Sequence, residues 1–529
     1  CEQEYATAHK TGAAAIREVH ANAIVGADGS QIGNPAYTLP GLGLWAPYPD
    51  MLDNVYTRSF SPADAIRCNW WGGYVAARKL GAQPLWEQVL TGGVNGSIYF
   101  CMSGTEGLFS ADASLADFFM EKQLPGIREI SERHGPLLKR CPVKKMGLGI
   151  LFSMASQHAL TLDARFATQN SSVDALLRYC EAEGISAYFY TEKQARQGVL
   201  EKDGVRMLFM PQVLCLADST AKSLEAYVNA GGTLVADIQT GIRNERAALR
   251  PAGVLDQLFG IKQNPAGQPK KADLKATLWD AQVDWPLLTV DAGTVCADGT
   301  AFANCEGMPA CIQKQTGKGK AVFLNFSISK AISDKLADQN TRAAMRRLFA
   351  ESGVSSGIVP PPGVKLTWFS GDGFESLGCI VTADGDQTKP LALEKSRHVY
   401  DVRNGRYLGQ TATVTPAECG GRNALLSFFD KPVPELKMDC VGQGRRGDAV
   451  EMKIGLNGDA ARPLLVKAMQ PGGAEEIGMR IAIPASKSAV SVKLPFALNA
   501  PQGEWRIEVT DLATGIKSSA AIKIEGSAQ

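Results

Sequence analysis

The sequence lacks several features that would assign a function directly. No apolar run approaches the roughly 18 residues of a membrane helix, so no membrane-spanning helix is expected. The formal net charge is only +1, with 21% charged residues, which gives no electrostatic reason to expect nucleic acid or a membrane surface as a partner. No Gly-rich segment stands in the strand-turn-helix context of a dinucleotide site, so no cofactor is expected.

Cysteine patterning gives no metal site. The twelve cysteines are scattered without a CxxC pair or a Cys/His cluster of zinc spacing. Cys296, Cys305 and Cys311 lie close together in a loop-rich stretch, where a disulfide and reduced structural thiols are both open. Cys215 follows an apolar strand, as an amidotransferase nucleophile does, but it has no flanking glycine, so its context indicates apolar packing.

The first residues show neither an initiator Met nor a charged-then-apolar leader. Ala13, Ile16 and Val19 follow helical spacing on a helix already under way. We therefore expect a fragment that lacks its N-terminal part, and its compartment stays unknown because such a loss would also remove a signal peptide.

A chain of 529 residues is too long for one core and predicts several domains. Residues 1–140 alternate helices with strands, which we expect at 23–30, 42–50, 54–60 and 96–104, with a helical region at 70–90. Strands separated by helices or long loops imply a parallel sheet. We interpret this part as the C-terminal half of a (β/α)8 barrel, known as a TIM barrel.

The rest of the chain predicts one more α/β unit followed by β modules. Residues 141–358 read as a doubly wound sheet of flavodoxin type, similar to glutamine amidotransferase domains. Its helix at 218–230 has Asp218 and Ser219 as N-cap candidates and ends at Gly231. Helical periodicity then vanishes, and we expect a small β domain at 363–434 and an immunoglobulin-like sandwich at 435–529. The predicted fold class is multidomain α/β plus β.

Candidate catalytic acids lie at the carboxyl ends of the expected barrel strands, where barrel enzymes place their chemistry. Glu106 follows the last strand and Asp28 ends the first, so these two are the catalytic candidates. Asp50 and Asp64 lie in loops expected on the same face. A turn role competes for each acid, because Asp28-Gly29 and Pro49-Asp50 are turn dipeptides in their own right.

Aromatic residues near the strand ends favour a carbohydrate ligand, because the C–H faces of sugars stack on aromatic rings. Core packing is the competing explanation for each ring. Arg58 either binds a sugar or fixes the charge of a neighbouring carboxylate. The expected substrate-binding residues are Trp45, Tyr48, Asp50, Arg58, Trp70 and Trp71, with Tyr74 as a further aromatic.

Three segments carry a resemblance to a known family: NGSIYFCMSG with the following EG, YVNAGGTLVADI at 227–238, and LDQLFGI at 255–261. In this order of parts the chain resembles glycoside hydrolase family 42, the β-galactosidases whose middle domain mediates trimer formation. The resemblance covers roughly residues 1–430 and leaves out the last sandwich. It implies an oligosaccharide substrate, a homo-oligomer (a trimer or a dimer), and a retaining mechanism with two carboxylates.

The catalytic pair of the family does not carry over. If residues 23–30 form the fifth strand, the acid/base position lies upstream of Cys1. If residues 54–60 form the seventh strand, the nucleophile position falls at Ser59, which is no carboxylate. The resemblance as a whole implies a glycoside hydrolase acting on β-linked galactosides or related oligosaccharides. A noncatalytic carbohydrate-binding or scaffold protein of the same architecture is the alternative.

Overall fold

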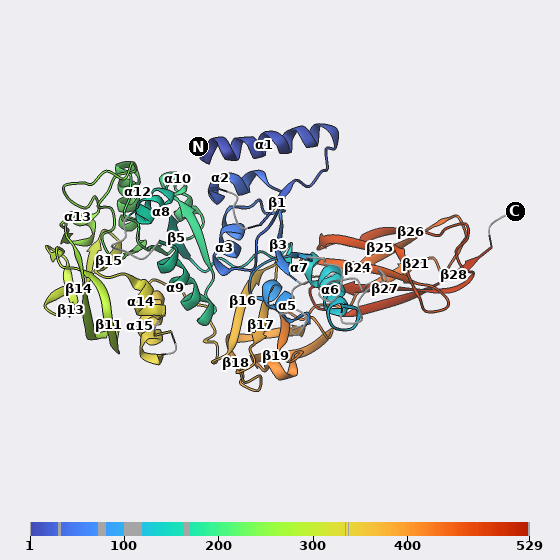
Figure 1. Ribbon diagram of the computed structural model, residues 1–529. Helices are drawn as coiled ribbons and strands as arrows, with labels where there is room; N and C mark the ends of the chain where they lie inside the picture. The colour runs from blue at the N-terminus through green and yellow to red at the C-terminus, as the bar shows by residue number, and fades with distance from the viewer. Residues whose placement is uncertain are drawn as a thin grey trace. The chain divides into compact units, whose positions relative to one another are not determined.

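The computed structural model describes residues 2–29, 33–71, 81–99, 119–162, 169–333, 335–336, 338–456 and 458–526. The chain divides into two compact units (Figure 1). Unit 1 comprises residues 1–42, 50–62 and 145–357, and unit 2 comprises residues 43–49, 63–144 and 358–529.

Unit 1 begins with helices and one short strand. These are α1 (Glu2–Val19), β1 (Gly26–Asp28), α2 (Pro35–Thr38), the 3-10 turn η1 (Leu39–Gly41) and α3 (Met51–Phe60). The predicted strand at 54–60 is wrong, because this segment lies within α3. Asp50 caps that helix: its Oδ1 accepts hydrogen bonds from the backbone N–H groups of Leu52 at 2.8 Å and Asp53 at 3.3 Å. This cap makes the helix start favourable.

The centre of unit 1 is a seven-stranded sheet in the order β13-β14-β15-β8-β7-β5-β6. The five strands from β15 to β6 run parallel, and β14 and β13 extend the sheet in antiparallel fashion. The strands are β5 (Leu148–Phe152), β6 (Ala187–Thr191), β7 (Met207–Met210), β8 (Thr233–Ala236), β13 (Thr300–Cys305), β14 (Met308–Thr316) and β15 (Gly319–Leu324). The remaining strands are β9 (Ile261–Lys262), β12 (Val295–Cys296), and the hairpin of β10 (Pro269–Leu278) and β11 (Ala281–Asp291).

Helices lie between these strands and after the last of them, β15. They are α8 (Met154–Leu162), α9 (Gln169–Ala182), α10 (Glu192–Arg196), α11 (Val199–Lys202), α12 (Asp218–Asn229), α13 (Asp256–Phe259), α14 (Ile328–Ser333) and α15 (Gln339–Glu351). The N-cap of α12 is Ala217, which makes no side-chain cap, so the expected capping by Asp218 or Ser219 is wrong. The helices α14 and α15 are separate, because Asp338 caps the start of α15 and accepts from Thr341 N at 2.9 Å.

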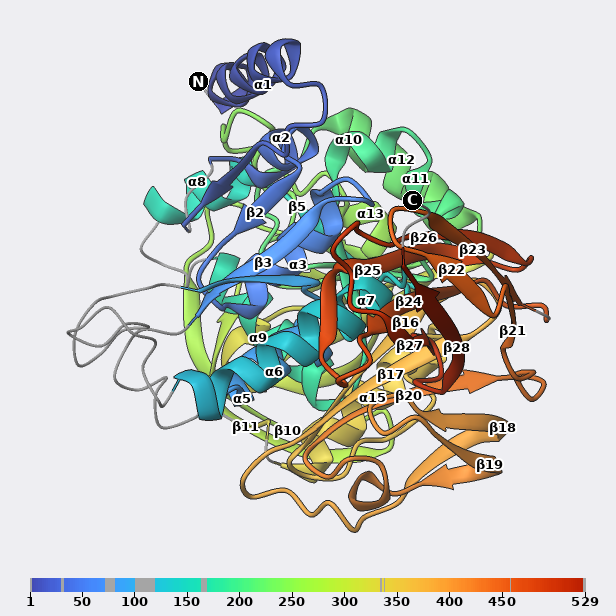
Figure 2. The same ribbon diagram turned by 90° about the vertical axis from the view of Figure 1, so that its right-hand side faces the viewer.

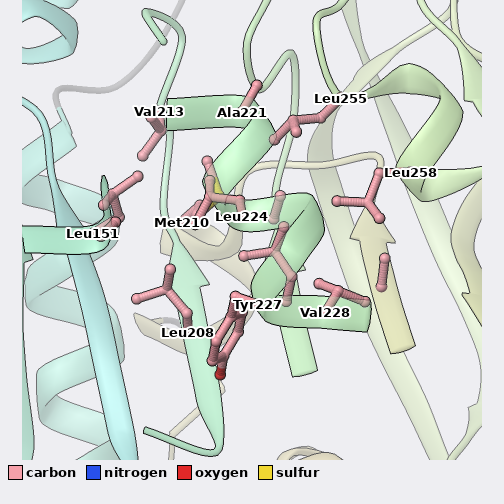
Figure 3. Packing of buried hydrophobic residues seen from close by; sticks show 14 of the residues in the cluster. Leu151, Leu208, Met210, Val213, Ala221, Leu224, Tyr227, Val228, Leu255 and Leu258 are labelled. Atoms are coloured by element: carbon pink, nitrogen blue, oxygen red, sulfur yellow. The ribbon is translucent and has the colours of Figure 1, made fainter. Parts of the chain in front are cut away.

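The central parallel strands are covered on both faces because successive strand residues are apolar and buried. Leu151 of β5 belongs to the cluster that α12 covers with Leu224 and Val228, and Figure 3 shows these side chains beside Leu208 and Met210 of β7. The next residue of β5, Phe152, points to the opposite face, where its ring lies 5.5 Å from that of Tyr56 in α3. Successive side chains on a strand face opposite ways, so this sheet is buried between two helical layers.

Unit 2 holds three parallel strands, β2 (Leu44–Ala46), β3 (Ile66–Trp71) and β4 (Gly96–Tyr99). The helical region expected at 70–90 is wrong at its start, since Trp70 and Trp71 end β3 and the helix α5 covers only Gln83–Leu90. A continuous helical run follows β4 with the segments η2 (Phe119–Gln123), α6 (Leu124–Glu129), η3 (Ile130–His134) and α7 (Gly135–Leu138).

The C-terminal part of unit 2 is all β. One five-stranded sheet contains β16 (Val364–Ser370), β17 (Glu375–Val381), β18 (Leu391–Asp401), β19 (Arg406–Val414) and β20 (Asn423–Phe429), with the 3-10 turn η4 (Pro416–Glu418). Two further sheets share a core around Trp505. They contain β21 (Lys437–Cys440), β22 (Gln443–Arg445), β23 (Ala449–Gly455), β24 (Arg462–Met469), β25 (Glu475–Ser486), β26 (Val490–Pro495), β27 (Gly503–Asp511) and β28 (Lys517–Glu525) (Figure 2). The chain is thus α/β plus β and multidomain, as the sequence predicted.

Candidate functional site

The predicted site lies at the carboxyl ends of the parallel strands, and in unit 2 these ends bring two aromatic residues together. Tyr48 follows β2 and Trp70 lies near the end of the neighbouring β3. Their ring centroids are 6.1 Å apart at an interplanar angle of 37°. Tyr48 is about half exposed, whereas Trp70 is partly buried. An exposed ring backed by a second ring offers a surface on which a sugar ring stacks.

The other predicted aromatics fall into two groups. Trp45 in β2 is only 2% exposed and belongs to the core, so its ring contacts other side chains and offers no open face to a ligand. Trp71 ends β3, and its side chain lies outside the described residues, as does Tyr74.

In the structure, β3 takes the place of residues 54–60 as the strand after which the nucleophile of a retaining pair is expected. Because residues 54–60 are helical, the strand before the last one is β3. No Asp or Glu occurs between Asp64 and Glu87, so β3 ends in two Trp residues and is followed in the sequence by Gly72 and Gly73 and not by an acid. Ser59 lies in α3, where its hydroxyl donates to Val55 O at 2.6 Å and accepts from Phe189 N at 2.9 Å. Ser59 therefore joins α3 to the edge strand β6.

The predicted acids are not assembled into one described cluster. Asp28 ends β1 and is exposed, and Asp64 is exposed in the turn before β3. The carboxylate of Asp50 is engaged as the cap of α3. Glu106 lies outside the described residues.

One acid of unit 1 was not singled out from the sequence. Asp53 stands in the first turn of α3, where burial, and then the nearby charge of Asp50, raise the pKa of its carboxyl group to about 7. A carboxyl group that titrates near neutral pH is suited to act as a general acid. Nothing in the sequence marked it, because an acid three residues after an N-cap is ordinary at a helix start.

Arg58 holds α3 against β6 in unit 1. Its Nη2 and Nε donate to the carbonyl oxygen of Ala187 at 2.9 and 3.2 Å. Its guanidinium carbon lies 5.5 Å from the ring centre of Tyr188. These contacts give Arg58 a role in packing the helix on the sheet.

Other chemistries find little support in the described residues. Cys215 is buried, and burial raises the pKa of its thiol to about 11, so it is not the thiolate that an amidotransferase needs. Within the described ranges no group of three or more His, Cys, Asp or Glu could hold a metal ion. Of the helices described there, none is long and apolar enough to cross a membrane.

Solved structures share this architecture. The β-galactosidase from Bacillus circulans sp. alkalophilus aligns with a TM-score of 0.64 and 12% identity, over 80% of this chain and 66% of that one. A catalytic mutant of a family 42 β-galactosidase from G. stearothermophilus aligns with a TM-score of 0.60 and 14% identity, over 78% of this chain and 64% of that one. The chain thus spans slightly less than two thirds of the length of these two enzymes. The β-galactosidase from Halorubrum lacusprofundi gives a TM-score of 0.56 and 15% identity, over 81% and 67% of the two chains.

These likenesses define the class: the chain has the multidomain fold of the family 42 β-galactosidases. The more particular assignment concerns its middle part, since residues 148–346 match the family model described as the β-galactosidase trimerisation domain. A search of curated proteins finds no match to the chain. The resemblance drawn from the three sequence segments is confirmed.

Proposed function

We propose that the chain is part of a glycoside hydrolase acting on β-linked galactosides or related oligosaccharides. The observation that carries the proposal is the match of residues 148–346 to the β-galactosidase trimerisation domain. The shared fold of the flanking parts supports it, because the domain stands here in the same architecture as in β-galactosidases.

In this proposal the sugar stacks on Tyr48 and Trp70 and is cleaved with the help of carboxyl groups near the strand ends. Cleavage of a glycosidic bond needs one carboxylic acid to protonate the leaving oxygen and one carboxylate to stabilise or trap the oxocarbenium-like centre. Glu106 and Asp28 remain the predicted catalytic acids.

A specific observation favours a second candidate function, that of a noncatalytic carbohydrate-binding protein. The resemblance places the nucleophile after the seventh strand, whereas β3 ends in two tryptophans and is followed in the sequence by two glycines in place of an acid. Such a protein would keep the aromatic surface of Tyr48 and Trp70 without a carboxylate pair.

The test is hydrolysis of a chromogenic β-galactoside by the natural full-length protein. Glu106→Gln or Asp28→Asn is expected to lower kcat at least tenfold, which corresponds to about 1.4 kcal/mol of transition-state stabilisation. Asp64→Asn serves as the control, because Asp64 is an exposed turn residue and its loss should leave the rate unchanged. Unchanged rates in both test variants would remove these acids from the mechanism. Sugar binding without turnover would favour the noncatalytic candidate.

We also infer that the middle domain is flavodoxin-like and assembles the protein into a homo-oligomer, as a trimer or a dimer. The parallel order β6-β5-β7-β8 agrees with flavodoxin-type winding, and the trimerisation-domain match supports assembly. Light scattering coupled to gel filtration would measure the mass of the assembly. A monomer at micromolar concentration would refute this part of the proposal.

A further inference from the structure

A pocket of about 1050 Å³ opens in unit 1 at the carboxyl edge of the parallel sheet. Its lining includes Ser153, which follows β5, Thr191 at the end of β6, and Ala217 in the segment after β7. The strands lie in the order β6-β5-β7-β8. The chain therefore adds β6 on one side of β5 and then β7 on the other side, so that the order of winding reverses between β5 and β7. Open α/β sheets bind their ligands in the crevice beside such a reversal.

One face of α1 forms the facing wall. Gln3, Ala6, Thr7 and Lys10 all line the pocket, and their spacing of three, four and seven residues places them on one side of the helix. Ala6 is 2% exposed, whereas the three polar residues around it are exposed. The wall therefore combines a tightly packed small residue with polar groups that face the open space.

The floor of the pocket presents a fixed carboxylate. Glu192, directly after β6, accepts a hydrogen bond from Thr220 Oγ1 at 2.9 Å and a longer one from Ala217 N at 3.4 Å. Arg196 donates to the same Thr220 hydroxyl at 2.6 Å. A carboxylate and a guanidinium held in place by neighbours need little reorganisation to receive a ligand.

The composition of the lining indicates the chemical class of the ligand. Three cationic and three acidic side chains face the pocket, so their formal charges cancel and an anion gains little from them. They are Lys10, Lys193, Arg196, Glu192, Asp218 and Glu245. Hydroxyl and amide side chains supply most of the other polar groups, and the ring of Tyr37, 46% exposed, offers a stacking face.

We propose that this pocket binds a neutral saccharide. Sugars present many hydroxyl groups that both donate and accept hydrogen bonds, which suits a lining of mixed acids, bases, hydroxyls and amides. The volume of about 1050 Å³ lies just above the roughly 300–1,000 Å³ of typical ligand pockets, enough for more than one sugar ring. The site is built from unit 1 alone and stands whether or not the protein hydrolyses glycosides.

The proposal is tested by a substitution in α1 that places a bulky side chain in the pocket. Thr7→Trp places a large ring on the pocket face of the helix, whereas Ala8→Trp places the same ring at an exposed neighbouring position outside the lining. Titration calorimetry of the natural protein with galactose and with thiodigalactoside, whose sulfur linkage resists hydrolysis, measures the stoichiometry and the Kd. We expect Thr7→Trp to remove one saccharide site per chain and Ala8→Trp to keep it. Tyr37→Ala should weaken this site at least about tenfold through the loss of its stacking face.

Two outcomes would overturn the proposal. If Thr7→Trp leaves saccharide stoichiometry and affinity equal to those of Ala8→Trp, the pocket holds no sugar. If inorganic phosphate, and neither sugar, binds in a manner that Thr7→Trp abolishes, the site is an anion site. Because the readout is binding and not turnover, failure of the hydrolase proposal would leave this result interpretable.

Discussion

Replacement of Arg403 is expected to destabilise unit 2 in a pH-dependent way. Arg403 makes a two-pronged contact with Glu129: its Nε lies 2.8 Å from Oε1 and its Nη2 lies 2.9 Å from Oε2. The buried His134 contacts the same carboxylate at 3.1 Å. The guanidinium also lies 4.1 Å from the ring centre of Trp86. Arg403→Met keeps much of the side-chain volume and removes all the charged contacts.

The size of the expected loss of stability follows from the lowered pKa of the Glu129 carboxyl group. Burial acts to raise its pKa, but the hydrogen bonds from His134 and Arg403 outweigh burial and lower the pKa to about 2 from 4.5. At 1.36 kcal/mol per unit, a depression of this size corresponds to about 3 kcal/mol. Because the folded pKa lies below the unfolded value, this stabilisation is complete above about pH 5 and is lost as the pH falls towards 2.

Urea unfolding followed by tryptophan fluorescence measures the effect, since Trp86 lies under the guanidinium. The difference between the natural protein and Arg403→Met should be about 2–4 kcal/mol at pH 7 and should shrink steadily below pH 5. Arg506→Met is the control, because Arg506 is 59% exposed in its pair with Glu508, and such surface pairs contribute about 0–1 kcal/mol. A difference that stays constant from pH 7 to pH 3, or one no larger than that of the control, would refute the reasoning.

Two further predictions concern unit 1. Glu183→Ala should lower its free energy of unfolding by about 3–5 kcal/mol in urea titrations, because Arg342 and Arg346 each contact this buried carboxylate at 2.7 Å and would lose their partner; a loss under 1 kcal/mol would contradict this. Asp237→Asn should flatten the dependence of stability on pH between about 4 and 8. Burial raises the pKa of Asp237 to about 8, so its ionisation opposes folding over that range, and an unchanged pH profile in the variant would show that Asp237 does not titrate there.

Most of the middle domain could be predicted from the sequence because its strands are continuous apolar runs. The segments MGLGILFS, ISAYFY and VRMLFMP correspond to β5, β6 and β7, all central or covered strands. Such strands are buried on both faces, so their composition alone marks them. The strand predicted at 54–60 was wrong because tertiary contacts, and not local composition, decide the structure of this segment. Val55, Tyr56 and Phe60 are β-formers by composition, but the Asp50 cap and the packing of their helix on Phe152 and Phe189 override that preference.

The candidate site was predictable only in part. The position of Tyr48 and Trp70 after neighbouring strands suggested that they meet, and the two rings do lie near each other. Asp53 could not be found from sequence, since its raised pKa comes from burial and from a charge across a helix turn.

By itself, the sequence determined the α/β plus β organisation, the apolar strands of the middle domain and the absence of any acid between Asp64 and Glu87. These properties reside in local composition, which acts over a few residues. Only the tertiary structure decided which strand precedes the last one, that Ser59 and Arg58 hold a helix to a sheet edge, and that α1 closes a polar pocket over β5 and β6. Such features depend on contacts between residues more than a hundred positions apart. The pattern of neighbouring residues in the sequence does not predict these contacts.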